Sequence, residues 1–310
     1  MPMLSRVADS LYWMGRYIER AEHMARLLEV TRDLLVDLKE VDPDQATAQW
    51  EATVATLGVV DSGFDAIVVS PSEPTSVLSC IMHARENARQ VREVIASEMW
   101  EHLNRAYWSL HEVRGVKDEA RIAEALSDVQ TTSFLWDGVT DGSMRRGEGW
   151  LFLKLGKFVE RTDRLSRTIS VRLAARAKTS ERSGSAASPE SENVMWLTLL
   201  RGAGALDAYH HAYPTGVDGR NVLSFLVFDR DFPRAVRYGT RVALDFATRL
   251  SSMHGSPDDP VGRAFGRMAA MLEYGDVDEL VERGPTIFLN EVLTESGAAS
   301  SLLARKYFLA

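Results

Sequence analysis

The sequence has one cysteine, almost no strand signals and no apolar run long enough to cross a bilayer. A single cysteine, Cys80, excludes an internal disulfide and any metal cluster that needs several cysteines. A membrane-spanning helix needs about 20 apolar residues, and the longest apolar stretch covers only residues 194–200. The net charge of -8 argues against a nucleic-acid backbone as the main partner. Because no separate apolar signal segment precedes the first periodic stretch, we expect a cytoplasmic protein with no membrane or nucleic-acid partner.

Helical periodicity is present along almost all of the 310 residues. Apolar residues recur at steps of three and four from Leu4 to Leu28, which is the pattern of an amphipathic helix packed against other helices. This helix is expected to end near Lys39, before Asp42-Pro43. The only β-branched run, residues 66–69, is too short to seed a sheet. The sequence therefore predicts an all-α fold of about ten helices, with the others near 45–60, 76–98, 98–114, 117–136, 145–178, 190–212, 231–252, 258–274 and 285–309.

The chain also resembles itself. Residues 15–30 match residues 156–171 at an offset of 141, with five identities in sixteen positions. Residues 77–93 match residues 222–238 at an offset of 145, with seven identities in seventeen. Such self-similarity indicates an internal duplication. We expect two tandem helical repeats packed as one body, residues 1–141 and 142–310, with the boundary in the turn-rich segment 137–142 and a flexible loop at 178–189.

Two charged stripes recur in both copies. One is acidic, with steps of four, three and four that keep its side chains on one helix face: Gly15, Glu19, Glu22 and Arg26, then Gly156, Glu160, Asp163 and Arg167. The other is mainly basic: Arg85, Glu86, Arg89 and Arg92, then Arg230, Asp231, Arg234 and Arg237. A glycine inside a helix costs about 1 kcal/mol relative to alanine. Its presence in both acidic stripes predicts the close approach of another helix or a ligand.

These stripes have two interpretations. The acidic and basic side chains could pair across a helix interface, which fixes register without any chemistry. Alternatively, the arginines could bind a phosphate or carboxylate through their forked donors while a nearby glutamate moves a proton. Both arrangements can coexist, so the sequence assigns no catalytic residue.

Other candidate sites have weaker support in the sequence than the two charged stripes. A di-iron bundle needs paired Glu-x-x-His elements, and the nearest match is a lone Asp207-Ala-Tyr-His210. Standard phosphate-binding glycine loops are absent from the sequence, so we predict no metal and no cofactor. Cys80 lies in an apolar stretch typical of core packing. Trp108 and its aromatic neighbours lie at near-helical spacing, which usually indicates core.

Four blocks of the sequence resemble the bacterial alpha-E domain family. They are MLSRVADSLYWMGRYIERAEHMARLLEV, ARENARQVREVIASEMWEHLN, EGWLFLKLGKFVERTDRLSRTI and FDRDFPRAVRY. The resemblance covers nearly the whole chain and implies an all-helical fold. It points to family positions at Gly15, Glu19, Arg20, Arg85, Glu86, Asn87, Arg89, Trp100, Asn104, Trp150, Gly156, Glu160, Arg161, Asp231, Pro233 and Arg234.

Genes of this family typically lie beside those of circularly permuted ATP-grasp proteins and transglutaminase-like peptidases, and some members are fused to the ATP-grasp partner. The resemblance thus implies a role in making or trimming amide bonds. We expect a non-catalytic helical subunit that presents substrate to an ATP-grasp-type amide ligase. The alternative is an enzyme acting on an amide or acyl-phosphate bound between the repeats, with Arg85, Arg89 and Arg234 holding the anion and Glu19 or Glu160 moving a proton. A purely structural homo-oligomer is the third reading.

Overall fold

The computed structural model describes residues 3–38, 42–59, 63–183, 189–256 and 259–309, and within these ranges every regular element is a helix. The all-α fold class is therefore confirmed. The described chain forms more elements than the ten expected, namely α1 (Ser5–Leu38), α2 (Pro43–Leu57), α3 (Phe64–Val69), α4 (Val77–Gln90), α5 (Ser97–Glu112), α6 (Glu119–Ser143), α7 (Glu148–Ser183), α8 (Pro189–Gly202), α9 (Leu206–Ala212), α10 (Gly219–Leu223), the π-helical segment η1 (Ser224–Phe228), α11 (Val236–Met253), α12 (Pro260–Tyr274), α13 (Val277–Arg283) and α14 (Pro285–Tyr307).

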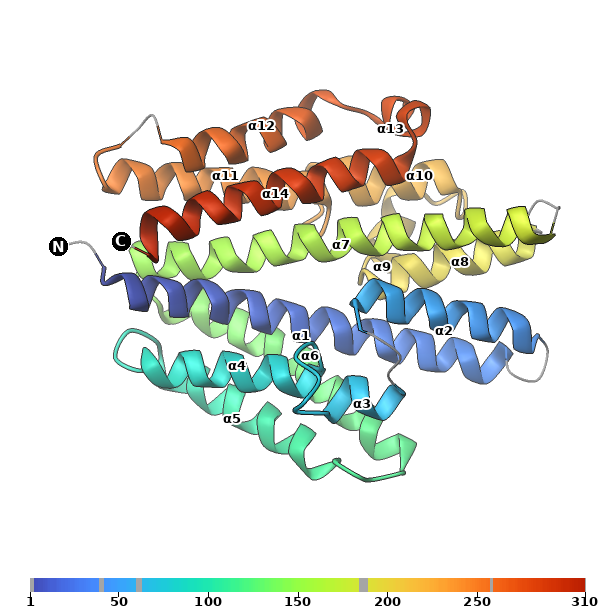
Figure 1. The fold of residues 1–310 in the computed structure, drawn as a ribbon, viewed down its shortest axis with the longest axis horizontal. Coiled ribbons are helices and arrows are strands. Elements are labelled where there is room, and N and C mark those ends of the chain that lie inside the picture. The colour runs from blue at the N-terminus through green and yellow to red at the C-terminus, as the bar shows by residue number, and fades with distance from the viewer. Residues whose placement is uncertain (1–2, 39–41, 60–62, 184–188, 257–258, 310) are drawn as a thin grey trace.

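The two longest helices, α1 and α7, lie side by side at the centre and run in the same direction (Figure 1). Helices α4 and α6 pack on α1, and α5 packs on both of them. Helices α11 and α14 pack on α7, and α12 packs on both of those. Helix α1 serves both halves of the core: Leu11 and Met14 belong to the larger cluster with α7, whereas Met24 and Leu28 belong to the cluster with α4, α5 and α6.

Helix α6 continues through residues 137–142, where the turn residues predict a boundary. Asp137 and Asp141 in these last turns form ion pairs with Lys154 and Lys157 of α7. These contacts favour the helix over a turn, because they offset the low helix propensity of aspartate and glycine.

Helix α11 begins at Val236, later than the predicted start at 231, so Pro233 lies in the loop before it rather than in its first turn. Asp229 accepts a hydrogen bond from the backbone N–H of Phe232 at 2.7 Å. This turn competes with helix formation. Only Arg237 of the second basic stripe therefore lies on a helix.

Several smaller expectations differ from the structure. In the predicted loop 178–189, residues 178–183 are the end of α7, Pro189 begins α8, and residues 184–188 lie outside the described residues. The predicted helix 190–212 is divided into α8 and α9 near Gly204, whose φ is +60°. The β-branched run 66–69 is helical within α3. Trp108 is exposed rather than in the core.

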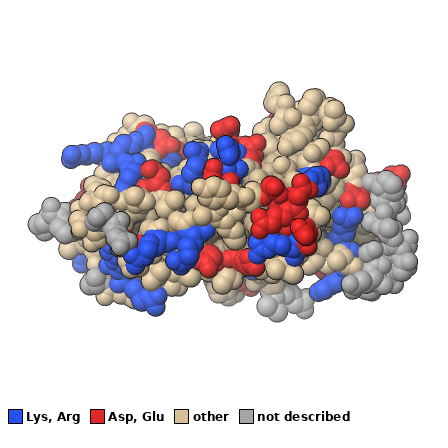
Figure 2. Space-filling view, turned by 90° about the horizontal axis from the view of Figure 1, so that it is seen from above, with Lys and Arg blue, Asp and Glu red and all other residues tan. Residues whose placement is uncertain are grey.

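Charges of both signs are interspersed on the face that carries α12 and α13 (Figure 2), so the net charge of -8 is not gathered there. Across the described ranges, no helix combines the length and apolarity needed to cross a membrane.

Candidate functional site

The two acidic stripes meet where α1 and α7 approach most closely. A Cβ atom added to Gly15 would overlap the carbonyl oxygen of Leu153, and one added to Gly156 would overlap the carbonyl oxygen of Tyr12. The two contacts are reciprocal, since Tyr12 and Leu153 each precede the glycine of their own helix by three residues. A side chain at either position would separate the two backbones, which explains glycine at both.

Beyond the glycines, each helix supplies one glutamate to the other. Glu19 of α1 accepts hydrogen bonds from Nε and Nη2 of Arg161 at 2.5 and 2.9 Å. Glu160 of α7 accepts hydrogen bonds from Nε and Nη2 of Arg20 at 2.6 and 3.1 Å. Each Glu-Arg dipeptide thus pairs with the other. Such forked arginine–carboxylate contacts fix orientation as well as distance.

Glu160 has more partners than Glu19. It also accepts hydrogen bonds from Nε of Arg16 at 2.6 Å and from Nε of Arg164 at 2.8 Å, and its side chain has no exposed surface. Burial alone would raise the pKa of Glu160, but Arg16, Arg164 and Arg20 together hold it well below its usual value. Glu160 is therefore ionised and surrounded by donors.

Arg16 also forms an ion pair with Asp163 at 2.8 Å. Burial raises the pKa of Asp163, and the nearby Arg16 only partly opposes this. Asp163 thus lies at the edge of the network, next to a cation that Glu160 already holds.

Glu22 connects α1 to a third element. It pairs with Arg26 on its own helix and accepts hydrogen bonds from Nη1 and Nη2 of Arg234 at 3.2 and 2.9 Å. Arg234 lies in the loop before α11. Burial would raise the pKa of Glu22, but Arg234 and Arg26 hold it far below its usual range. The acidic stripe of α1 thereby fixes both α7 and the start of α11.

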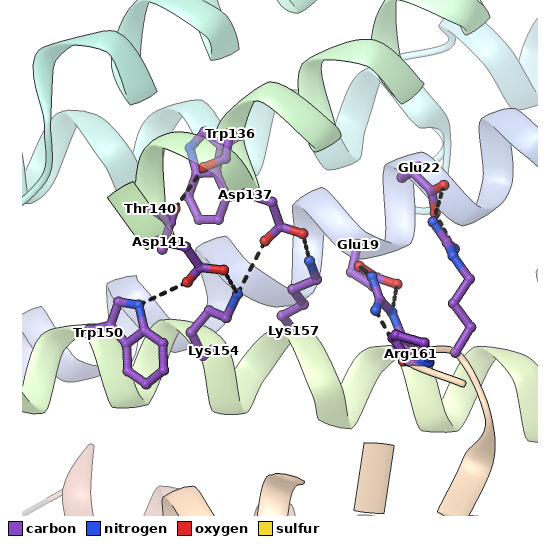
Figure 3. A network of polar contacts seen from close by, with 12 residues as sticks. Glu19, Glu22, Trp136, Asp137, Thr140, Asp141, Trp150, Lys154, Lys157 and Arg161 are labelled. Carbon is purple, nitrogen blue, oxygen red and sulfur yellow. Dashed lines mark hydrogen bonds and ion pairs between the residues drawn. The ribbon is translucent and has the colours of Figure 1, made fainter. Parts of the chain in front are cut away.

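The network continues along α7 toward α6 (Figure 3). Lys157 pairs with Asp137, and Lys154 reaches Asp141 at 3.0 Å and Asp137 at 3.5 Å. Asp141 also accepts a hydrogen bond from Nε1 of Trp150 at 3.2 Å. Burial lowers the pKa of Lys157 to about 7, and Arg161 adds to this effect. Charged side chains from three helices thus follow one face of α7.

His23 lies beside the glutamates and is buried. It shares a hydrogen bond of 3.1 Å with Thr168 of α7. Burial lowers the pKa of His23 to about 4, and Arg164 adds to this effect. His23 is therefore neutral at pH 7 and is enclosed by the helix contact.

The first basic stripe lies apart from this network. Arg85 donates a hydrogen bond to Asn104 at 2.5 Å. The guanidinium groups of Arg85 and Arg92 lie 5.2 and 4.8 Å from the centre of the Trp100 ring. Arg92 follows the end of α4 rather than continuing its face. These arginines pack on an aromatic ring of α5, not on the acidic stripes.

The remaining members of the predicted set are mostly exposed. Arg89 and Glu86 pair with each other on the surface, with 61% and 49% of their side chains exposed. Arg167 and Asp231 are also exposed. These four residues do not take part in the buried network.

Arg237 is buried but pairs elsewhere. Its Nη2 lies 2.7 Å from Glu273 of α12 and its Nη1 donates to the carbonyl oxygen of Phe228. Arg230 reaches the same Glu273 at 3.4 Å. Of the six predicted arginines in the two basic stripes, Arg234 alone joins the acidic stripe.

Sequence reasoning missed four cations of the network: Arg16, Lys154, Lys157 and Arg164. A signal for two of them was present, because Arg16 and Lys157 each follow the glycine of their own helix. Lys154 and Arg164 have no counterpart of the same charge at the 141-residue offset, where Trp13 and His23 stand. Their roles depend on which helices lie side by side.

As a chemical site, the part of the network between α1 and α7 is closed. Its three buried glutamates are ionised and held by arginines, and its histidine is neutral and enclosed. In the part of the chain that the structure describes, no group of three or more His, Cys, Asp or Glu side chains is placed to hold a metal ion. The arrangement fixes α1, α6, α7 and the start of α11 relative to one another.

Comparison with known proteins gives partial relatives that are uncharacterised. One from Mycobacterium bovis and one from Mycobacterium tuberculosis are each 32% identical over 188 residues, and another from Mycobacterium tuberculosis is 31% identical over the same length. Each match covers 50% of this chain and 21% of the relative. The chain thus matches about a fifth of the length of these relatives. No solved structure matches.

Residues 3–308 match a family described as a predicted alpha-helical domain with a conserved ER motif. Glu-Arg dipeptides occur at 19–20, 160–161, 181–182 and 282–283, and the first two form the reciprocal ion pairs between α1 and α7. Because the match spans nearly the whole chain, this protein belongs to the Alpha-E family.

Proposed function

We propose that the protein is a non-catalytic helical subunit that presents substrate to an ATP-grasp-type amide ligase in the cytoplasm. The closure of the network supports a subunit rather than an enzyme. A general base must reach the proton it removes, whereas Glu19 and Glu160 are buried and already accept hydrogen bonds from arginines. The link to amide formation rests on the resemblance to the family, because genes of that family typically lie beside those of circularly permuted ATP-grasp proteins.

We also infer that the chain consists of two tandem helical repeats. The reciprocal contacts support this: Gly15 and Gly156 exchange backbone contacts, and so do the two Glu-Arg dipeptides, both at the 141-residue offset. Such exchange is what a two-fold symmetric interface produces. The boundary between residues 141 and 142 would then lie within the last turn of α6.

The alternative is an enzyme that acts on an amide or acyl-phosphate held between the repeats. It requires Arg85 and Arg89 to face the glutamates. Arg85 instead bonds to Asn104, and Arg89 pairs with Glu86 at the surface. The alternative therefore has less support than the subunit.

The proposal is tested by purifying the tagged chain from its host and identifying the bound proteins by mass spectrometry. We expect recovery of a circularly permuted ATP-grasp protein, with a transglutaminase-like peptidase as the second candidate partner. The recovered ATP-grasp protein is then assayed for acceptor-dependent ADP formation with and without added chain. Increased ADP formation at a one-to-one ratio supports the subunit. Turnover of an amide or acyl-phosphate by the chain alone would instead establish the enzyme.

A further inference from the structure

A groove of about 700 Å³ lies between α7 and α11, next to the end of α6, where Asp141, Trp150 and Lys154 of the network reach its lining. Its apolar lining is a series of aromatic rings. Trp150 and Phe246 meet edge to face with ring centres 5.1 Å apart, and Phe158 lies 6.1 Å from both Phe246 and Tyr238. Aromatic rings that line a concave surface are typical of small-molecule sites.

The rim of this groove is positively charged. Four cations line it, Arg146, Lys154, Arg241 and Arg249, against two carboxylates, Asp141 and Asp245, so the lining has a formal charge of +2. The whole chain carries -8. A cationic groove on an acidic protein attracts anions locally.

These two carboxylates, together with Asp137, which reaches Lys154 from outside the lining, do not neutralise all of these cations. Asp141 already accepts hydrogen bonds from Trp150, Lys154 and Arg146. Among the residues that the structure describes, Asp245 has one long contact, 3.7 Å to Arg249.

Arg241 has no ion pair with any described carboxylate; its Nη2 donates weakly to the carbonyl oxygen of Arg230 at 3.4 Å. Arg241 and Arg249 are both exposed and lie on α11, two turns apart. Their forked donors therefore remain available to a ligand.

The positions of the cations and rings favour a ligand that combines both chemistries. Arg241 lies 5.3 Å from the centre of the Tyr238 ring, and Arg249 lies 5.9 Å from that of Trp150. Each guanidinium is thus held next to an apolar surface. A ligand with an anionic group on an aromatic ring would therefore meet a guanidinium group and an apolar surface together.

We propose that this groove binds a small organic anion, a carboxylate or a phosphate attached to an aromatic ring. The ring lies against Trp150, Phe158 and Phe246, and the anionic group is held by Arg241 and Arg249. This site shares Asp141, Trp150 and Lys154 with the α6 end of the network but contains none of the ion pairs between α1 and α7, and it does not depend on an amide-ligase partner.

Isothermal titration calorimetry on the purified full chain tests this, with N-acetyl-phenylalanine and phenyl phosphate as probes. The neutral N-acetyl-phenylalanine amide and inorganic phosphate are the matched comparisons. We expect saturable binding of at least one aromatic anion, and the tighter of the two identifies the anionic group. The neutral amide and inorganic phosphate should each bind at least about tenfold more weakly.

Variants locate the site. Arg241→Gln and Arg249→Gln lie at exposed positions, so both should fold, as circular dichroism would verify, and each should raise the Kd about tenfold. Arg267→Gln on α12, with 62% of its side chain exposed, removes a similar charge elsewhere and should leave the Kd unchanged. Absence of saturable binding of both aromatic anions up to about 10 mM would overturn the proposal. The proposal would also be overturned if the neutral amide bound as tightly as N-acetyl-phenylalanine, or if Arg267→Gln weakened binding as much as Arg241→Gln and Arg249→Gln.

Discussion

Glu19 on α1 and Arg161 on α7 form a two-hydrogen-bond ion pair, with 3% and 12% of their side chains exposed. Glu160 and Arg20 form the same pair in the opposite sense, from α7 to α1. Because both carboxylates are buried, loss of either should leave arginine charges without compensation inside the fold.

The variant Glu160→Gln keeps the size of the side chain and removes its charge. Arg16, Arg20 and Arg164 would then lack their shared carboxylate, so we expect the free energy of unfolding to fall by roughly 3–5 kcal/mol. Urea denaturation followed by circular dichroism measures this. Glu86→Gln is the control, because its pair with Arg89 is exposed and its denaturation midpoint should not move. An equal effect of the two variants would show that the buried network is not stabilising.

Alanine at the glycine contact should separate α1 from α7. A methyl group at Gly156 would overlap the backbone of Tyr12, so Gly156→Ala should cost about 1–3 kcal/mol of stability. Gly297→Ala on α14 is the matched control, since no neighbouring atom lies within 4 Å of the added methyl group. There the gain in helix propensity should stabilise the protein by about 0.5–1 kcal/mol. We therefore expect the midpoint of thermal denaturation to fall for Gly156→Ala and to rise for Gly297→Ala. A shift in the same direction for both variants would contradict the close contact.

His23 should make stability depend on pH. The folded state holds it neutral down to a pKa of about 4, whereas an unfolded histidine titrates near pH 6.5. Between these values the unfolded state binds more protons, so stability should fall by roughly 3 kcal/mol as the pH drops from 6.5 to 4.

Comparison with His23→Gln isolates this dependence, because glutamine can retain the hydrogen bond to Thr168 without titrating. The slope of unfolding free energy against pH should be shallower for His23→Gln between pH 6.5 and 4.5. Below that range both proteins should lose stability together, since the lowered pKa values of Glu19, Glu22 and Glu160 give stability that is lost as these carboxylates protonate. Identical slopes above pH 4.5 would mean that His23 is solvated in the fold.

Arg172 is a buried arginine for which we expect substitution to retain or raise stability, in contrast to the variants above. It is buried in α7 and donates to Gln49 and Thr53 at 2.6 and 3.0 Å, with no ion pair to any described carboxylate. Burial lowers its pKa to about 10. A buried charge without an ion partner carries an uncompensated desolvation cost, so Arg172→Met should retain or raise the thermal midpoint. Arg234→Met, which removes a partner of Glu22, should lower it.

The helical class could be predicted because it depends on local patterns, whereas α2 begins at Pro43, two residues before the predicted start at 45. Asp42, predicted to end the first helix with Pro43, caps α2 by accepting a hydrogen bond from the backbone N–H of Gln45. The glycine contact could be anticipated as well, since a glycine inside a helix needs a reason in packing. These features are encoded within a few residues.

The partners of the acidic stripe could not be predicted in the same way. Whether a glutamate meets Arg20, Arg89 or Arg161 depends on which helices lie side by side, and that is a tertiary property. Arg89 fails to reach the network because it faces solvent at the end of α4. The helical state of residues 137–142 likewise depends on lysines of α7, which the local sequence does not reveal.

The parallel pairing of α1 with α7 also sets an order of events during synthesis. Helix α1 ends at Leu38 and α7 begins at Glu148, 110 positions later. At about 5–20 residues per second, the ribosome needs roughly 5–20 s to make the intervening chain. During that interval the face of α1 that carries Gly15, Glu19 and Glu22 has no partner. A charged face is hydrated in the unpaired helix and attracts other nascent chains less than a leucine stripe would, so the charges at the centre of the fold should also limit aggregation of its first half before α7 has been made.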